Sequence, residues 1–166
     1  MVLSTFFAFF SAAALLALAL NRLSYLRLKI RIIGRARWDL NICCGATDGG
    51  GVNADIVRHS PRIPNFVRVD DIYRLPFRNR QFKRVLCSHT MEHVDDPERF
   101  DRELRRVGET VLYLLPPLWD VAAAFNLLEH KWIFLTFRKE HRRLPRHVKL
   151  PLSWTLQRHF KQRVKA

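Results

Sequence analysis

The first 20 residues form one uninterrupted apolar run. Residues 2–20 contain no charged side chain, and only two serines and a threonine are polar. A helix needs about 20 apolar residues to cross the hydrocarbon core of a bilayer, so the run favours a transmembrane anchor over residues 1–21. Two alternatives stay open. One is a cleaved signal peptide, although the start of the chain lacks the basic region that such peptides carry, and the other is a buried core helix.

Basic side chains follow the apolar run at once. Residues 21–33 alternate apolar and basic side chains, and this period of two predicts a strand. The same segment also suits the surface of an anionic membrane, where each cation contributes about 1 kcal/mol. Cations beside a single span favour the cytoplasmic side. We therefore predict a basic juxtamembrane linker over residues 22–37, an anchor–domain boundary within residues 34–38, and a single-pass membrane protein whose domain faces the cytoplasm.

Short apolar runs separated by turns predict a sheet in the remainder of the chain. Five strands are expected, over residues 40–44, 52–56, 66–69, 84–88 and 110–115. Asp96 and Pro97 offer a helix cap and a first-turn proline, and apolar residues then recur at helical spacing until Gly108. Strands separated by helices or crossovers predict an α/β fold with a mostly parallel sheet. Further helices are expected over residues 119–128 and 150–160, and another strand over residues 133–137.

Polar residues gather where the predicted strands end. They are Gly45, Asp55, Asp70, Asp71, Ser88 and His89. In open parallel sheets, ligands bind at the carboxyl ends of the strands. The pattern therefore predicts a ligand site at this edge of the sheet.

Three pairs of segments also resemble a known family. They are residues 39–45 with 52–56, 69–77 with 82–89, and 92–97 with 103–107. Their order and spacing resemble the class I S-adenosylmethionine-dependent methyltransferases of the group often called type 11, most specifically from the Leu75-Pro76-Phe77 block through Val107. The resemblance implies a Rossmann-like, mostly parallel sheet flanked by helices, a methyltransferase-like domain over residues 38–137, and S-adenosylmethionine as cofactor.

The resemblance also implies cofactor-binding roles for residues at the strand ends. Gly45 would let the backbone approach the cofactor closely. Asp55 would accept hydrogen bonds from the ribose hydroxyls, and Asp71 matches the family position near the adenine amine. Asn41 stands where the family has its first acidic residue, and Ser88 would line the pocket. Each of these residues has a plainer interpretation as a turn, cap or packing residue.

Histidines are the candidate catalytic groups. Alignment of donor and acceptor dominates methyl transfer, and a general base helps when the acceptor must lose a proton. We select His89 and His93 for this role, with His130 as a further candidate. His89 and His93 are four residues apart, as in some metal sites, but no third ligand presents itself in the sequence, so no metal site is expected.

Part of the family pattern is missing. Of the three glycines in the first loop only Gly45 remains, and the ten positions from Gly45 to Asp55 leave little room for the usual helix between the first two strands. Two hypotheses follow. The first is an enzyme that methylates an unknown small or lipid-like acceptor at a membrane face, and the second is a catalytically inactive methyltransferase-like scaffold or binding module.

The net charge of +14 points to an anionic partner. Residues 138–166 form a basic tail with one acidic residue, Glu140. Beside a membrane anchor, contact with anionic headgroups is favoured over nucleic acid, and a solvated basic helix is an equal alternative. Cys43, Cys44 and Cys87 show no metal-binding spacing and are expected to be free, buried thiols.

Overall fold

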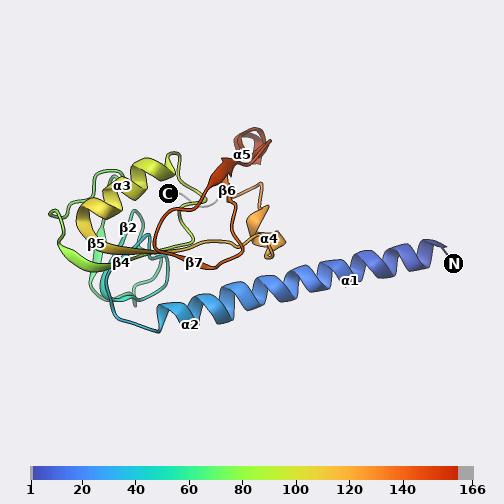
Figure 1. Ribbon diagram of the computed structural model, residues 1–166, viewed down its shortest axis with the longest axis horizontal. Helices are drawn as coiled ribbons and strands as arrows, with labels where there is room; N and C mark the ends of the chain where they lie inside the picture. The colour runs from blue at the N-terminus through green and yellow to red at the C-terminus, as the bar shows by residue number, and fades with distance from the viewer. Residues whose placement is uncertain (1, 161–166) are drawn as a thin grey trace.

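The apolar N-terminus is one long helix that projects from the body of the molecule (Figure 1). In the computed structural model, which describes residues 2–160, α1 (Val2–Arg22) continues through the π-helical η1 (Leu23–Lys29) into α2 (Ile30–Ile33). The stretch Phe9–Ile33 is long and apolar enough to cross a membrane, and 6% of its most apolar window is buried. A core helix would be mostly buried, so this stretch is not a core helix within residues 2–160.

The basic segment after the anchor is helical, which corrects the strand expected from its alternating pattern. No glycine or proline interrupts the chain before Gly34, where α2 ends. Ser24 and Ile32 are buried and Leu28 is half-buried, so positions four apart form one face that packs on the domain. The burial of that helical face, rather than the alternation of apolar and basic side chains, decides the conformation of this segment. The first strand begins at Trp38.

Six strands form the main sheet, in the order β3-β2-β1-β4-β5-β7. They are β1 (Trp38–Ile42), β2 (Gly50–Asp55), β3 (Phe66–Arg68), β4 (Phe82–Ser88), β5 (Gly108–Leu114) and β7 (Glu140–His141). All neighbouring pairs are parallel except β5 and β7, which are antiparallel. The expected mostly parallel sheet and its five strands are therefore confirmed, and each strand end lies within two residues of its expected position.

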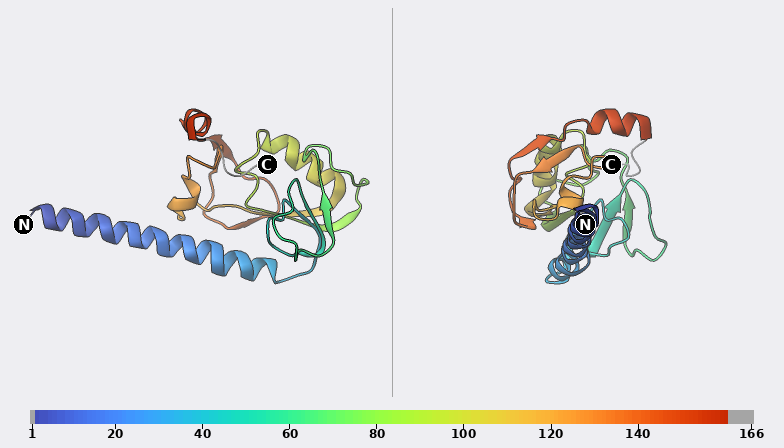
Figure 2. Two further views of the ribbon diagram at one scale, coloured as in Figure 1. Left: turned by 180° about the vertical axis from the view of Figure 1, so that it is seen from behind. Right: turned by 90° about the vertical axis from the view of Figure 1, so that its right-hand side faces the viewer.

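Different helices cover the two faces of this sheet (Figures 1 and 2). Because side chains alternate along a strand, Val85 and Val111 join the main core beneath α3 (Pro97–Val107), whereas Leu86 and Leu114 pack against Ile33 on the opposite face. α3 begins as expected, since the Asp96 carboxylate accepts a hydrogen bond from the backbone N–H three residues later. The end of the N-terminal helix thus serves as part of the domain.

The remaining elements are short. α4 (Val121–Ala124) is one turn within the helix expected over residues 119–128, and α5 (Ser153–Phe160) starts three residues later than expected. β6 (Trp132–Phe134) pairs with β8 (His147–Lys149) in a separate two-stranded antiparallel sheet. Residues 43–49 between β1 and β2 form no helix, which confirms the missing first crossover helix.

Candidate functional site

A cavity of about 980 Å³ opens at the carboxyl ends of β1, β2 and β4. Its floor comes from the loop after β1, from Asp55 and from the segment after β4. Its other wall is the N-terminal helix, which contributes Tyr25, Leu26 and Ile30. The sheet edge predicted to bind a ligand is therefore a cavity between the sheet and the last turns of the N-terminal helix.

The loop after β1 is held by side-chain amides. Asn41, which is buried, donates its Nδ2 protons to the carbonyl oxygen of Thr47 at 2.8 Å and to Asn53 Oδ1 at 3.1 Å. Gly49 lies directly on Asn41, and a Cβ added at Gly49 would be 2.6 Å from the Cβ of Asn41. Asn41 therefore organises the loop through neutral hydrogen bonds, where the family has a carboxylate.

Gly45 and Asp55 are brought together across this loop. Gly45 has a φ of +55°, a conformation that favours glycine, and its N–H donates to Asp55 Oδ2 at 2.8 Å. Asp55 Oδ1 accepts from the Ile56 N–H at 2.8 Å, and His59 Nε2 lies 3.9 Å from Oδ2. A Cβ added at Gly45 would meet no atom within 4 Å, so open space faces this glycine. The carboxylate can accept about four hydrogen bonds, and these two N–H donors leave about two acceptor positions.

Asp71 and Ser88 differ in their placement. Ser88 lines the cavity, and its buried Oγ has no hydrogen-bond partner within residues 2–160. Asp71 is exposed and does not line the cavity; its Oδ1 accepts from the Tyr73 N–H at 2.8 Å, which is a local turn bond. Of the five residues expected to bind a cofactor, the structure thus brings together all but Asp71.

His89 is tied into a buried chain of polar groups. Its Nδ1 lies 3.1 Å from Glu92 Oε1, and its Nε2 lies 2.7 Å from Lys139 Nζ, which also donates to Ser24 Oγ at 2.8 Å. Burial lowers the pKa of His89, against the opposing effect of Glu92. Burial also lowers the pKa of Lys139 to about 8. A neutral His89 that donates from Nδ1 and accepts at Nε2 satisfies both neighbours.

A second cluster forms around Glu92. The rings of His93 and His130 meet edge to face, with centroids 4.7 Å apart, and one donor atom from each of Glu92, His93 and His130 lies within 4.8 Å of the others. Burial raises the pKa of Glu92, but the hydrogen bond with His89 and the nearby imidazoles outweigh it and bring the pKa to about 2. Burial lowers the pKa of His130 to about 4. The sequence offered no third ligand to accompany His93; the structure supplies His130, 37 residues away.

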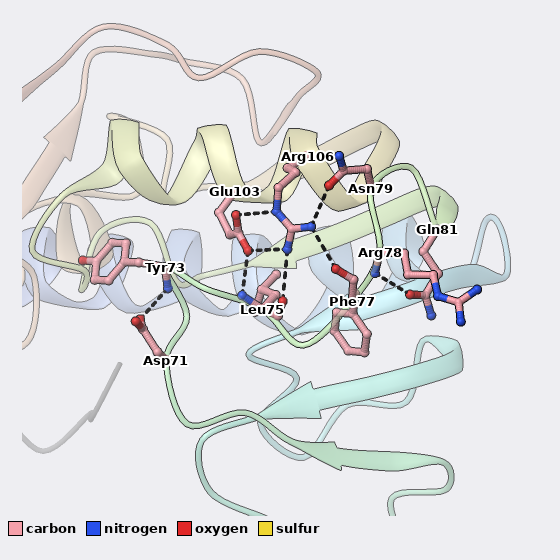
Figure 3. A network of polar contacts seen from close by, with 9 residues as sticks. All are labelled: Asp71, Tyr73, Leu75, Phe77, Arg78, Asn79, Gln81, Glu103 and Arg106. Atoms are coloured by element: carbon pink, nitrogen blue, oxygen red, sulfur yellow. Dashed lines mark hydrogen bonds and ion pairs between the residues drawn. The ribbon is translucent and has the colours of Figure 1, made fainter.

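The Glu103–Arg106 pair fastens the segment after β3 to α3 (Figure 3). Arg106 uses all five N–H groups of its guanidinium, two toward Glu103 at 2.7 and 2.8 Å. The others reach the carbonyl oxygens of Leu75 and Phe77, at 3.0 and 2.8 Å, and Asn79 Oδ1 at 2.9 Å. Glu103 also accepts from the Leu75 N–H at 2.6 Å. The pair therefore positions the Leu-Pro-Phe block.

The cysteines are free thiols without the features of nucleophiles. Burial raises the pKa of Cys44 to about 12 and raises those of Cys43 and Cys87 as well. A thiol with a raised pKa holds little thiolate at neutral pH. Their expected role as small packing residues fits this chemistry.

The comparisons with known proteins agree with the resemblance found in the sequence. Residues 50–110 match a family described as a methyltransferase domain. A solved structure of a SAM-dependent methyltransferase, possible histamine N-methyltransferase, from Thermotoga maritima is 19% identical, with a TM-score of 0.45 over 58% of this chain and 54% of that one. The chain thus spans about half the length of that structure. No curated protein matches the chain.

Two other solved structures have similar scores. A SAM-dependent methyltransferase from Aquifex aeolicus is 13% identical, with a TM-score of 0.41 over 58% of this chain and 68% of that one. A protein from Pyrococcus horikoshii is 16% identical, with a TM-score of 0.45 over 84% of this chain and 80% of that one. The resemblance to methyltransferases is confirmed by the family match, over residues 50–110.

Proposed function

We propose that this chain, whose residues 50–110 match a methyltransferase domain, binds S-adenosylmethionine in the cavity and methylates a small or lipid-like acceptor at a membrane face. The observation that carries the proposal is the Asp55 carboxylate, which ends β2, fixes the Gly45 loop and lines the cavity. Methyl transfer needs a donor held in line with its acceptor, and a cavity with a fixed ribose anchor provides that alignment.

The residues present fit the cofactor. Asp55 keeps about two acceptor positions for a pair of ribose hydroxyls, and the open space in front of Gly45 admits a ligand close to the backbone. The volume of about 980 Å³ lies at the upper end of the range of ligand pockets, so donor and acceptor have room together. When bound, S-adenosylmethionine supplies an electrophilic methyl group on a cationic sulfur, and the negative charges of Asp55 and Glu92 favour that cation.

The helix wall supports an acceptor that comes from the membrane. Tyr25, Leu26 and Ile30 line the cavity and belong to the apolar stretch Phe9–Ile33. An acceptor held at a bilayer surface would therefore reach the cavity along the helix that anchors the domain. The basic residues after the apolar run favour a cytoplasmic domain, and together with the basic tail they favour anionic headgroups as partners.

His93 is better suited than His89 to accept a proton from the acceptor. Both nitrogens of His89 have neighbours, Glu92 and Lys139. His93 Nδ1 lies 2.9 Å from the carbonyl oxygen of Glu129, and within the described residues this is the one hydrogen bond of its ring. Because a carbonyl oxygen only accepts, Nδ1 carries the proton and Nε2 keeps a lone pair. His93 is thus the proposed base, and His89 the residue that positions Glu92.

Calorimetric titration of the full chain in lipid nanodiscs with S-adenosylmethionine tests the proposal. We expect binding with one site per chain, and Asp55→Asn should weaken it by about tenfold or more, since a hydrogen bond to a charged group contributes about 1.5–3 kcal/mol. Asp70→Asn is the matched control, because Asp70 is an exposed carboxylate outside the cavity. A folded chain that binds no cofactor at millimolar concentration would refute the enzyme proposal.

A non-enzymatic scaffold is the second candidate. The observation in its favour is the seven-residue loop 43–49, which lacks the crossover helix whose N-terminus would face a bound nucleotide. Under this alternative the cavity binds no S-adenosylmethionine, so the same titration separates the two functions.

A further inference from the structure

We propose that Glu92, His93 and His130 together bind one divalent transition-metal ion at the wall of the cavity. All three residues are buried and line the cavity, and one donor atom of each lies within 4.8 Å of the others. Ligands of a tetrahedral zinc ion lie about 3.4 Å apart, so binding would draw these donors together by about 1 Å.

Unpartnered polar atoms within the cluster are the strongest evidence. Glu92 Oε2 and His130 Nδ1 are fully buried and have no hydrogen-bond partner in residues 2–160. Leaving a buried polar atom unsatisfied costs about 1–3 kcal/mol, and more when the group is charged. Two such atoms in side chains that lie together point to a shared ligand that accepts lone pairs, and a metal cation is such a ligand.

The surroundings orient two of the three ligands. His93 Nδ1 donates to the carbonyl oxygen of Glu129 at 2.9 Å, which fixes the tautomer with a lone pair on Nε2. Glu92 Oε1 is held by His89 Nδ1 at 3.1 Å, which leaves Oε2 to bind the ion. These outer hydrogen bonds are of the kind that accompanies metal-binding histidines and carboxylates.

Backbone contacts hold the two contributing segments in register. The Lys131 N–H donates to the Glu92 carbonyl oxygen at 2.7 Å, and the Trp132 indole donates to the Val94 carbonyl oxygen at 2.9 Å. On the other side, Gln157 Nε2 donates to the His130 carbonyl oxygen at 2.9 Å. The ligands therefore stand on a frame that exists before any ion binds.

The ligand set indicates the class of metal. Two imidazoles and one carboxylate suit Zn²⁺, Co²⁺, Fe²⁺ or Mn²⁺, and three protein ligands leave at least one coordination position open. Here the open position would face the cavity. It would give an acceptor with an oxygen or nitrogen donor atom a place to bind. Because the ion would occupy His93 Nε2, the ion rather than His93 would then favour loss of the acceptor's proton. That consequence rests on the proposed function, whereas metal binding itself does not.

Cobalt titration of the full chain in nanodiscs, without S-adenosylmethionine, tests the site. After chelator treatment, Co²⁺ should bind once per chain and give visible d–d absorption bands typical of a four- or five-coordinate site with nitrogen and oxygen ligands. His130→Gln and, separately, His93→Gln should weaken binding by about 100-fold or more. His59→Gln is the matched control, because His59 lines the same cavity outside the cluster, and it should leave the bands unchanged.

Three results would overturn the site. They are no Co²⁺ binding by the folded chain, bands that persist in both histidine variants, and thiolate charge-transfer bands that would assign the metal to cysteine. A measurement on the unaltered chain guards against variants that fail to fold: Zn²⁺ should displace Co²⁺ and raise the unfolding midpoint, and an unchanged midpoint would contradict the site. Because no cofactor is added, failure of S-adenosylmethionine binding leaves this outcome unaffected.

Discussion

Replacing Arg106 with alanine tests how the Leu-Pro-Phe block is held. The guanidinium of Arg106 donates five hydrogen bonds, two to the Glu103 carboxylate and three to the segment after β3 (Figure 3). Arg106→Ala removes all five and leaves the carbonyl oxygens of Leu75 and Phe77 and part of Glu103 without their donors. We expect the segment to loosen and the domain to lose stability.

The magnitude follows from partial burial. The side chain of Arg106 is 33% exposed and that of Glu103 11%. An exposed ion pair contributes about 0–1 kcal/mol, whereas breaking a buried pair costs about 3–5 kcal/mol. This pair lies between those limits and holds two backbone carbonyls besides, so we expect Arg106→Ala to lower the free energy of unfolding by about 2–3 kcal/mol. Arg106→Lys should lose more than half as much, because an ammonium group cannot reproduce the planar fork.

Urea unfolding followed by tryptophan fluorescence, with the full chain in mild detergent, gives the free energies. Arg102→Ala is the matched control on the same helix, since the side chain of Arg102 is exposed and makes no hydrogen bond or ion pair with any described residue. It should change stability by less than about 0.5 kcal/mol. A double-mutant cycle with Glu103→Gln should give a coupling energy of about 1 kcal/mol or more. If Arg106→Ala costs no more than Arg102→Ala, the pair is only a surface feature and our account of this segment fails.

Three further predictions concern other parts of the fold. The pKa of Lys139 is lowered from 10.5 to about 8, so the unfolded chain binds more protons than the folded chain between these pH values. The free energy of unfolding should therefore rise with pH across that window, by about 3 kcal/mol in total. Lys139→Met should remove this rise in pH-dependent denaturation, and an equal rise in the variant would exclude Lys139 as its source. Gly51→Ala would place a Cβ 2.4 Å from the Trp38 carbonyl oxygen. It should destabilise the β1–β2 pair by about 2 kcal/mol or more, measured as a lower unfolding midpoint. An unchanged midpoint would contradict the close approach of these strands. Asp96→Ala removes the cap of α3 and should cost about 1 kcal/mol in the same assay, whereas Asp96→Asn should retain most of the stability.

Local chemistry determines much of the fold. Five strands follow from apolar runs bounded by turn residues, and α3 follows from its cap, its proline and its apolar spacing. The cluster of Asn41, Gly45, Asp55 and Ser88 at one cavity was also foreseeable, because parallel strands bring their carboxyl ends to the same edge of a sheet.

Other features depend on contacts between distant segments. The pattern of residues 21–33 has a period of two, yet the segment is helical because a face spaced by four residues packs on the sheet. β7 and β8 contain two and three residues, too few for a pattern, so their partners create them. Asp71 was expected to join the cofactor site, but a local turn bond holds it at the surface.

Most strands, α3, the parallel sheet and the edge where a ligand would bind could be predicted from the sequence, because these follow from periodicity and caps within short stretches of chain. Contacts between distant segments decide that His130 meets His93 and Glu92, that Arg106 fastens the Leu-Pro-Phe block, and that the last turns of the N-terminal helix form a wall of the cavity. The physical reason is that irregular segments carry no periodic signal. Their positions are set by hydrogen bonds between residues far apart in the chain, such as that from the Lys131 N–H to the Glu92 carbonyl oxygen.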